Sequence, residues 1–339
     1  MKKILLSLFL CIAGIYNAEA QVGKVDDVKK SLETGNKDTV AWVYGGVLSV
    51  GINGGLLHNW GAGGELASLL VNGIFSGHLD RLNHNDIWSN NLDMNYGLTY
   101  NYSSSFIPHK TDDRLDFTSK YGVLIDSTRK IFLTGLFNFK SQFTHGYDYS
   151  LPNWDSVSTS KFISPAYITT AIGFEYRKGS DVSLFLSPVA GRLTLVDRYY
   201  TLMNPQGAFG VPYGKNSFIQ FGAYFSGRYV IEITKNMVFK TRLDLYSNYL
   251  AKDTKDSTGA VIKKDNPGNI SLLFDNLFSW KISKYFNITL GATFIYDNNV
   301  PYIPTYVENG VVKQKNEPTN GLGWLQMKDV FTFGVGYNF

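Results

Sequence analysis

The chain has 339 residues with a formal net charge of +4, and 15% of its residues are aromatic, including 22 Tyr and 23 Phe. A charge excess this small leaves no basic footprint, which excludes nucleic acid as a partner. After residue 20 there is no apolar run of 18 or more residues. Membrane-spanning helices are therefore excluded, and a soluble exported protein or a membrane β-barrel is left.

Residues 1–20 have the pattern of a cleaved signal peptide. Lys2 and Lys3 precede an apolar stretch over residues 4–15, and the A-x-A sequence at 18–20 comes directly before Gln21. The single cysteine, Cys11, lies inside this segment, and Leu10 before it is too large for a lipoprotein signal. We therefore expect an exported mature chain with no disulfide bond.

Residues 21–40 are polar and are predicted to form a periplasmic N-terminal arm. Val25, Val28 and Leu32 follow a rough helical stripe. The sequence leaves open whether the arm is a short helix or disordered. It also leaves open whether the arm caps the structure that follows or contacts a periplasmic partner.

Period-2 alternation then recurs in segments of about ten residues. In residues 92–100, for example, large apolar residues alternate with Asp93, Asn95, Gly97 and Thr99. The alternation predicts about twelve strands. They are 41–52, 64–81, 88–102, 114–124, 131–143, 165–178, 181–192, 216–231, 237–249, 269–281, 285–297 and 329–339.

The connections between these segments alternate in length. Those after the even-numbered segments are short: 82–87, 125–130, 179–180, 232–236 and 282–285. Those after the odd-numbered segments are long: 53–63, 103–113, 144–164, 193–215, 250–268 and 298–328. Tight periplasmic turns and long surface loops are typical of outer-membrane barrels. We predict an all-β, antiparallel transmembrane outer-membrane β-barrel over residues 41–339. A soluble sandwich is the alternative, and it would be released without detergent.

Aromatic residues are expected in two rings where the barrel crosses the membrane surfaces. The ring at the short turns would contain Trp42, Trp88, Tyr176, Tyr229, Trp280 and Phe286. The ring at the long loops would contain Tyr102, Tyr147, Tyr149, Tyr249 and Trp324.

The last segment, VFTFGVGYNF at 330–339, alternates aromatic or apolar residues with small or polar ones up to Phe339. A final strand with Tyr337 and a terminal Phe339 resembles the signal read by the barrel-assembly machinery of Gram-negative bacteria. The alternative is that Phe339 is only an aromatic of the membrane-surface ring.

Four stretches in the first half resemble a known family: LLHNWGAGGE (56–65), WSNNLDMNYG (88–97), KTDDRLDFTSKYG (110–122) and SQFTHGYDY (141–149). Together they are similar to an outer-membrane family of Bacteroidetes that is catalogued only as a domain of unknown function. The resemblance implies an outer-membrane barrel. It carries no activity and no functional residues to transfer.

The strongest candidate site is the barrel lumen, because charged residues occupy inward positions of the predicted strands. They are Asp93, Asp116, Lys120, Lys140, Glu175, Arg177, Arg228, Lys240, Arg242, Asp244 and Asp275. Side chains in a barrel this small can meet across the interior. The mixture of signs favours a self-neutralising network that plugs the lumen, and a narrow selective pore is the alternative.

The other candidates are weaker. His78, Asp80 and His84 lack the spacing of a metal site, so no metal or cofactor is predicted. The charged loop 252–265 is a candidate site for divalent ions or lipopolysaccharide phosphates, with a merely solvated loop as the alternative. In the Gly-rich loop 51–64, Leu56, Leu57 and Trp60 are candidates to enter the barrel mouth or to contact a partner. His145 and Ser164 have lipid-facing parity and would be the residues of a lipid hydrolase, although no motif surrounds them.

The sequence therefore predicts a non-enzymatic outer-membrane protein that is structural or partner-binding, with a charge-plugged lumen and functional surface loops. The expected partners are the outer membrane with its lipopolysaccharide, the barrel-assembly machinery and a periplasmic or surface protein. A passive pore for small solutes is the second possibility, and a lipid hydrolase is the third.

Overall fold

The computed structural model describes residues 41–57, 65–149, 154–178, 181–203, 207–255, 259, 261–263, 265–283, 285–297, 305–308, 311–314 and 325–338. The predicted signal peptide (1–20), the N-terminal arm (21–40), Trp60, Trp324 and Phe339 lie outside these residues.

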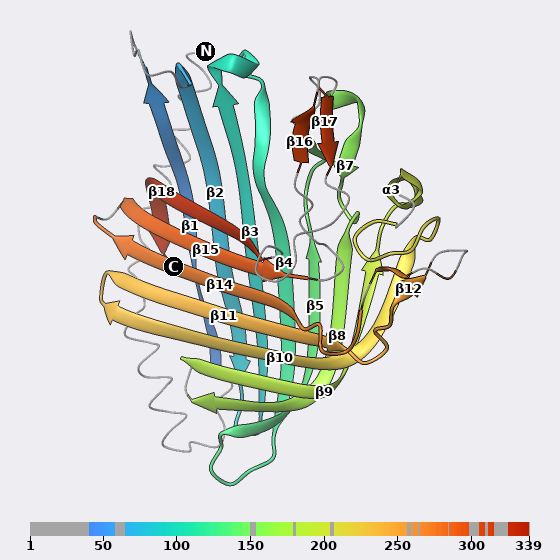
Figure 1. The fold of residues 1–339 in the computed structure, drawn as a ribbon. Helices are drawn as coiled ribbons and strands as arrows, with labels where there is room; N and C mark the ends of the chain where they lie inside the picture. The colour runs from blue at the N-terminus through green and yellow to red at the C-terminus, as the bar shows by residue number, and fades with distance from the viewer. Residues whose placement is uncertain are drawn as a thin grey trace.

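The described strands form a closed barrel in which every neighbouring pair is antiparallel (Figure 1). Its twelve strands are β1 (Ala41–Leu56), β2 (Ala67–Leu82), β3 (Asp86–Asn101), β4 (Pro108–Leu124), β5 (Ile131–Ser141), β8 (Ala166–Lys178), β9 (Val182–Leu195), β10 (Ser217–Thr234), β11 (Met237–Asn248), β14 (Ser271–Lys281), β15 (Phe286–Tyr296) and β18 (Gln326–Asn338). Each strand pairs with its neighbours along the chain, and β18 closes the ring on β1. The predicted fold class is confirmed.

Smaller elements lie in the connections at the long-loop end. Three two-stranded hairpins are formed by β6 (Gly146–Tyr147) with β7 (Ser158–Ser160), β12 (Thr254–Lys255) with β13 (Val261–Lys263), and β16 (Thr305–Glu308) with β17 (Val311–Gln314). The short helices are η1 (Tyr102–Ser104), η2 (Trp154–Ser156) and α3 (Arg198–Met203). Within the described residues, no helix has the length and apolar character needed to cross a membrane.

The strand limits differ from the prediction most clearly between β3 and β4. The predicted long loop 103–113 is wrong, because β4 begins at Pro108 and pairs with β3 from Tyr100↔Pro108 onward. Residues 108–114 are mostly polar on both faces, so they show no apolar alternation. Period-2 reasoning detects only strands with two different faces.

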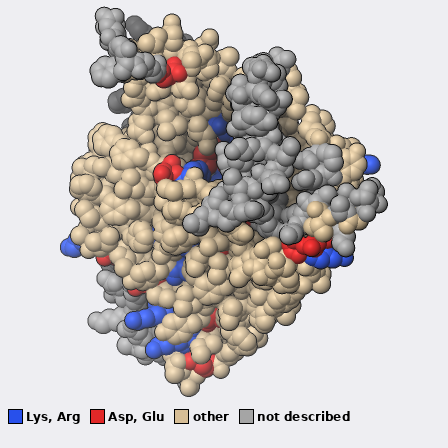
Figure 2. Space-filling view, viewed as in Figure 1, with Lys and Arg blue, Asp and Glu red and all other residues tan. Residues whose placement is uncertain are grey.

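The barrel is apolar outside and polar inside, and β5 illustrates this. Exposed and buried residues alternate from Ile131 to Asn138, with Leu133 and Phe137 outside and Thr134 and Asn138 inside. Buried Ser, Thr, Asn and charged residues likewise face inward on the other strands. In Figure 2 most of the described surface in view is uncharged, and the charged side chains lie near the middle of the face and toward its lower end and edges. This arrangement is the reverse of that in a water-soluble barrel.

Part of the interior is nevertheless an apolar core. Leu136, Ala171, Phe185, Ala190, Tyr224 and Tyr246 form one buried cluster on β5 and β8–β11. In Figure 1, β10, β11, β14, β15 and β18 cross in front of β1–β4 at a steep angle. Such a crossing resembles orthogonal sheet packing, in which side chains of the two walls share one interior.

Aromatic side chains are exposed at the short-turn end, as predicted. Trp42, Trp88, Tyr176, Tyr229, Trp280 and Phe286 all belong to this exposed set. The Trp42 and Trp88 rings meet edge to face at 6.4 Å, and Phe286 stacks on Phe333 at 6.0 Å.

At the long-loop end the prediction is only partly right. Tyr102 and Tyr249 are exposed, but Tyr147 and Tyr149 are half-buried against Trp154. Tyr149 also stacks on His109 at 4.1 Å. The polar hairpin β6–β7, which period-2 alternation could not predict, holds these rings together.

The closure between β1 and β18, which we call the seam, is short. Among the described residues it consists of five pairs, from Val47↔Asn338 to Gly51↔Gly334, whereas β15 and β18 share ten. Beyond Gly51, Asn53 Nδ2 donates to the Phe331 carbonyl oxygen at 2.7 Å. A side chain thus bridges the two strands where the backbone ladder has stopped.

Candidate functional site

The eleven predicted lumen residues and Arg114 come from seven strands. Asp93 is on β3; Arg114, Asp116 and Lys120 on β4; Lys140 on β5; Glu175 and Arg177 on β8; Arg228 on β10; Lys240, Arg242 and Asp244 on β11; and Asp275 on β14. Successive side chains of a strand point to opposite faces, so the period-2 spacing of these residues puts them on the inner face.

Asp116 is the centre of the larger cluster, and it is only 1% exposed. Its Oδ2 lies 3.0 Å from Arg242 Nη1, 2.9 Å from Arg114 Nη2 and 3.9 Å from Lys140 Nζ. Asn138 Nδ2 donates to its Oδ1 at 2.7 Å. A buried carboxylate needs such charged and hydrogen-bonded partners to stay ionised.

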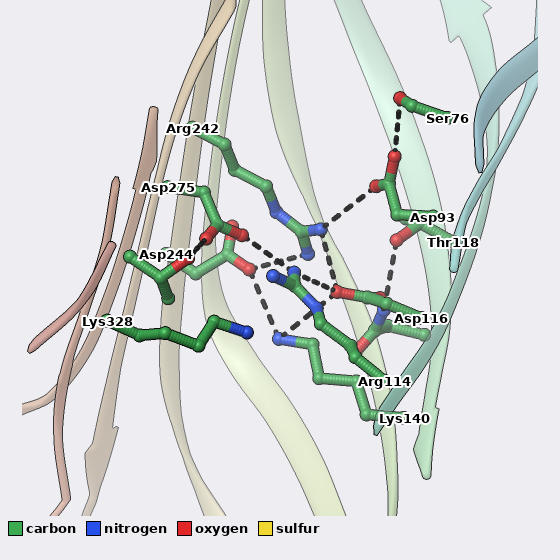
Figure 3. A network of polar contacts seen from close by, with 12 residues as sticks. Ser76, Asp93, Arg114, Asp116, Thr118, Lys140, Arg242, Asp244, Asp275 and Lys328 are labelled. Atoms are coloured by element: carbon green, nitrogen blue, oxygen red, sulfur yellow. Dashed lines mark hydrogen bonds and ion pairs between the residues drawn. The ribbon is translucent and has the colours of Figure 1, made fainter. Parts of the chain in front are cut away.

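Arg242 extends the cluster toward other carboxylates (Figure 3). Its Nη2 lies 2.6 Å from Asp244, and its Nη1 lies 4.0 Å from Asp93. Lys140 Nζ reaches Asp244 at 3.4 Å. The carboxylates of Asp116 and Asp244 are therefore each shared between cations.

Arg114 Nη2 also pairs with Asp275 Oδ2 at 2.7 Å. Hydroxyl groups complete the set of donors around the carboxylates. Three hydroxyls donate to the acids of the cluster: Ser76 to Asp93 at 2.7 Å, Ser226 to Asp244 at 2.7 Å and Thr293 to Asp275 at 2.6 Å.

A second cluster lies nearer the short turns and is centred on Glu175. Its Oε1 lies 2.6 Å from Lys120 Nζ and 2.9 Å from Arg177 Nε, and it accepts from Ser183 Oγ at 2.6 Å. Arg177 Nη2 donates to Ser89 Oγ at 2.8 Å. One carboxylate here serves two cations.

The two remaining predicted residues have fewer contacts. Arg228 Nη2 donates to Thr118 Oγ1 at 3.3 Å, while its buried Nε has no hydrogen-bond partner among the described residues. Lys240 forms no hydrogen bond or ion pair with the described part of the chain. Both side chains are half-buried.

Several of these contacts cross the interior. Arg242 on β11 meets Asp116 on β4, Lys140 on β5 meets Asp244 on β11, and Arg114 on β4 meets Asp275 on β14. These strands are not neighbours in the barrel order. The ion pairs therefore link opposite walls and occupy the lumen between them.

Sequence reasoning missed some participants. Arg114 has the same parity as Asp116 and begins the predicted strand 114–124, but it is not among the predicted lumen residues. Asn138 is uncharged and was not considered. Three further pairs lie nearer the loops: Lys328 with Asp112 at 2.7 Å, Lys110 with Asp113 at 2.9 Å, and Arg192 with Asp297 at 3.8 Å. Most of these residues fall in segments that were predicted as loops.

The weaker candidates are placed as follows. Within the described residues, no group of His, Cys, Asp and Glu side chains is arranged to hold a metal ion. His84 contacts Arg129 Nη1 through Nδ1 at 3.0 Å. The lipid-facing position predicted for Ser164 is wrong, because Ser164 lies before β8, is buried, and its Oγ accepts from Asp197 N at 2.8 Å. His145 stacks on Tyr147.

The surface connections carry their own polar contacts. In the first loop, Glu65 accepts from the hydroxyl of Ser103 at 2.7 Å and from its backbone N–H at 2.8 Å, and these hydrogen bonds lower the pKa of the Glu65 carboxyl. Lys161 Nζ donates to Asp197 at 2.5 Å, which raises the pKa of Lys161 and lowers that of Asp197. Both contacts join separate loops above the barrel.

The chain is similar to solved structures, and part of it matches a protein family. The structure is similar to the translocator domain of the autotransporter NalP from Neisseria meningitidis, with a TM-score of 0.35, 10% sequence identity, and coverage of 95% of this chain and 98% of that one. No curated protein matches the sequence. Residues 52–147, which hold most of the four motifs, match the family described as a protein of unknown function (DUF3078).

Proposed function

We propose that this protein spans a bacterial outer membrane as a barrel closed by its own lumen side chains, and that it acts as a structural or partner-binding protein through its loops. The Bacteroidetes origin implied by the sequence resemblance stays part of this prediction. The proposal rests mainly on the ion pairs between opposite walls of the barrel.

Those ion pairs support a plug because they are buried as well as numerous. Asp116, Lys120 and Glu175 are 1%, 3% and 1% exposed. A conducting lumen keeps its charged side chains in contact with water. Both signs meet within each cluster, so most of the charge is neutralised inside the lumen and there is no ring of one sign that would select one kind of ion.

The outer surface supports the membrane location. Apolar side chains such as Ile172, Leu186, Phe221 and Val335 are exposed on strands whose inner residues are polar. A contiguous exposed apolar surface marks a contact with lipid or protein. The exposed aromatics at the short turns match the depth at which such rings prefer to lie.

We further propose that the C-terminal strand carries the signal for the barrel-assembly machinery. Tyr337 is exposed near the end of β18, where an incoming assembly factor would reach it. Phe339, the other residue of this signal, lies outside the described residues. We propose no catalytic residue, cofactor or metal for the protein.

The hairpins β6–β7, β12–β13 and β16–β17 suit a docking face at the long-loop end, facing lipopolysaccharide or a surface partner. Contacts such as Glu65–Ser103 and Lys161–Asp197 hold neighbouring loops in place. Ordered loops lose less conformational entropy when a partner binds.

Single-channel conductance in planar bilayers tests the proposal. We expect residues 21–339 to be silent, and residues 41–339 as well. The variant Arg242→Ala, which removes a cation from the central cluster, should produce conducting events, whereas Glu232→Gln at the exposed end of β10 should stay silent. Steady ohmic steps in the unmodified protein would support the passive pore instead. Conductance that appears only after residues 21–40 are deleted would assign the block to the arm.

A further inference from the structure

Two cations in the short-turn half of the lumen form no ion pair in the described part of the chain. Lys120, Arg177, Arg228 and Lys240 all face this region from β4, β8, β10 and β11. Glu175 is shared by Lys120 and Arg177. Arg228 on β10 and Lys240 on β11 have no carboxylate within ion-pair distance in the described part of the chain.

Two acids on the opposite wall, Asp93 and Asp80, leave Arg228 and Lys240 without an ion-pair partner. Asp93 accepts from Ser76 and lies 4.0 Å from Arg242, so its attraction for Lys240 is shared. Asp80 on β2 faces the same half beside His78, and its buried Oδ1 has no hydrogen-bond partner in the described structure. Neither acid forms an ion pair with Arg228 or Lys240.

Arg228 and Lys240 are close to each other across adjacent strands. Arg228 pairs in register with Arg242, and Val230 pairs with Lys240, so Arg228 and Lys240 are diagonal neighbours on the inner face. Like charges at such positions repel each other. A bound anion would remove the repulsion and satisfy the buried Arg228 Nε.

We propose that Arg228 and Lys240 form a binding site for a small oxyanion, of which inorganic phosphate is the test case. The arginine offers a planar pair of N–H donors and the lysine a mobile ammonium, a combination suited to phosphate or carboxylate oxygens. Both side chains are half-buried, so the site is shielded but still reached by water.

Thermal unfolding of residues 21–339 in detergent, with phosphate replacing chloride at constant ionic strength, tests this site. A ligand that binds only the folded state raises Tm. We expect phosphate to stabilise the unmodified protein and Lys235→Gln, which neutralises an exposed cation in the β10–β11 turn. Arg228→Gln and Lys240→Gln should each weaken the apparent phosphate affinity by about tenfold or more.

Broadening of the ³¹P signal of phosphate by the unmodified protein gives a second measurement that does not depend on a variant folding. No broadening, or an equal Tm response in Arg228→Gln, would overturn the site. Neither result bears on conductance, so the oxyanion site and the plugged lumen succeed or fail separately.

Discussion

Glu175 shows how the lumen charges act on stability. Its carboxylate is 1% exposed and accepts from Lys120, Arg177 and Ser183. Burying an ionised carboxylate without partners would carry a large desolvation penalty. The partners of Glu175 offset that penalty, and such an offset does not by itself add net stability. Removing a single member is a different matter, because the remaining charges stay buried without a counter-ion.

The substitution Glu175→Gln should therefore lower the free energy of unfolding by about 3–5 kcal/mol, since Lys120 and Arg177 would then face each other without a carboxylate. Guanidinium unfolding in lipid vesicles, followed by tryptophan fluorescence, measures the change. Glu232→Gln, an exposed acid of β10, should stay within about 0.5 kcal/mol. Equal effects of the two substitutions would contradict the role given to the Glu175 cluster.

Gly334 lies at a position of the seam where the backbone of β1 leaves no room for a side chain. A Cβ at this position would lie 2.6 Å from the Gly51 Cα and still closer to the Val50 carbonyl oxygen. Backbone atoms cannot move aside as a flexible side chain can. We expect Gly334→Ala to destabilise the barrel by about 1–3 kcal/mol through the seam.

The matched control for the seam is Gly291→Ala on β15, where the nearest atom to an added Cβ is 3.8 Å away. Disulfide formation between cysteines placed at Val50 and Val335, a registered pair of the seam, reports the local effect. Gly334→Ala should slow this cross-link and Gly291→Ala should not. A cross-link unaffected by Gly334→Ala would show that the strands absorb the extra methyl group.

At the residue scale, the sequence predicts which side chains face inward but not which ones meet. Alternation alone assigns the inner face of Asp116 and Arg242. Their 3.0 Å contact depends on how far β4 and β11 are staggered and how closely the walls approach. Stagger is a property of the closed barrel. For the same reason the sequence could not separate Arg228 and Lys240 from the paired cations.

At the scale of the elements, the β4–β5 turn is held by the charged side chain of Asp126. The Asp126 carboxylate accepts from the Thr128 hydroxyl and from the backbone N–H groups of Ile131 and Lys130, and these bonds lower its pKa. An acid with a lowered folded pKa stabilises the fold above its unfolded pKa of about 3.9. That contribution is lost as pH falls through the folded value.

We therefore expect the Asp126 carboxylate to stay ionised at pH 5–7, so that amide exchange at Lys130 and Ile131 is slow and its protection constant over this range. Below about pH 4 these amides should lose protection, after correction for intrinsic rates. Asp126→Asn should lose protection already at pH 7 and abolish the acidic transition. An acidic transition that persists in Asp126→Asn would assign it to another group.

The sequence predicted elements well where the two faces of a strand differ. All twelve barrel strands overlap predicted segments, because lipid-facing and inward residues alternate along them. It failed where both faces are polar, as in the first residues of β4 and in β7, whose residues Ser158–Ser160 show no alternation. The helix α3 is too short for a helical period to be read.

For the whole molecule, the exposed apolar surface makes the membrane proposal testable by substitution. Leu186 is 58% exposed on β9. In water, replacing an exposed leucine with arginine changes little. In lipid, Leu186→Arg should cost about 2–4 kcal/mol, and Leu56→Arg, at the loop end of β1 and 85% exposed, should cost about 0–1 kcal/mol.

Unfolding in lipid vesicles compares the two variants under the same conditions. A cost for Leu186→Arg no greater than that for Leu56→Arg would contradict a membrane-embedded position for β9. It would favour a water-soluble protein, the class to which the soluble sandwich predicted as the alternative belongs. The apolar cluster around Phe185 was not predicted, because alternation describes one wall at a time and not the packing of two walls.

The seam sets an order of events for folding. Every other junction of the barrel joins strands that follow one another along the chain, so those hairpins can form locally as each strand appears. β1 and β18 come from opposite ends of the described chain, and bringing them together requires closing the largest loop. The ring therefore closes last, through five residue pairs. Until then β1 and β18 each present an unpaired edge, and during that interval the chain most needs a chaperone.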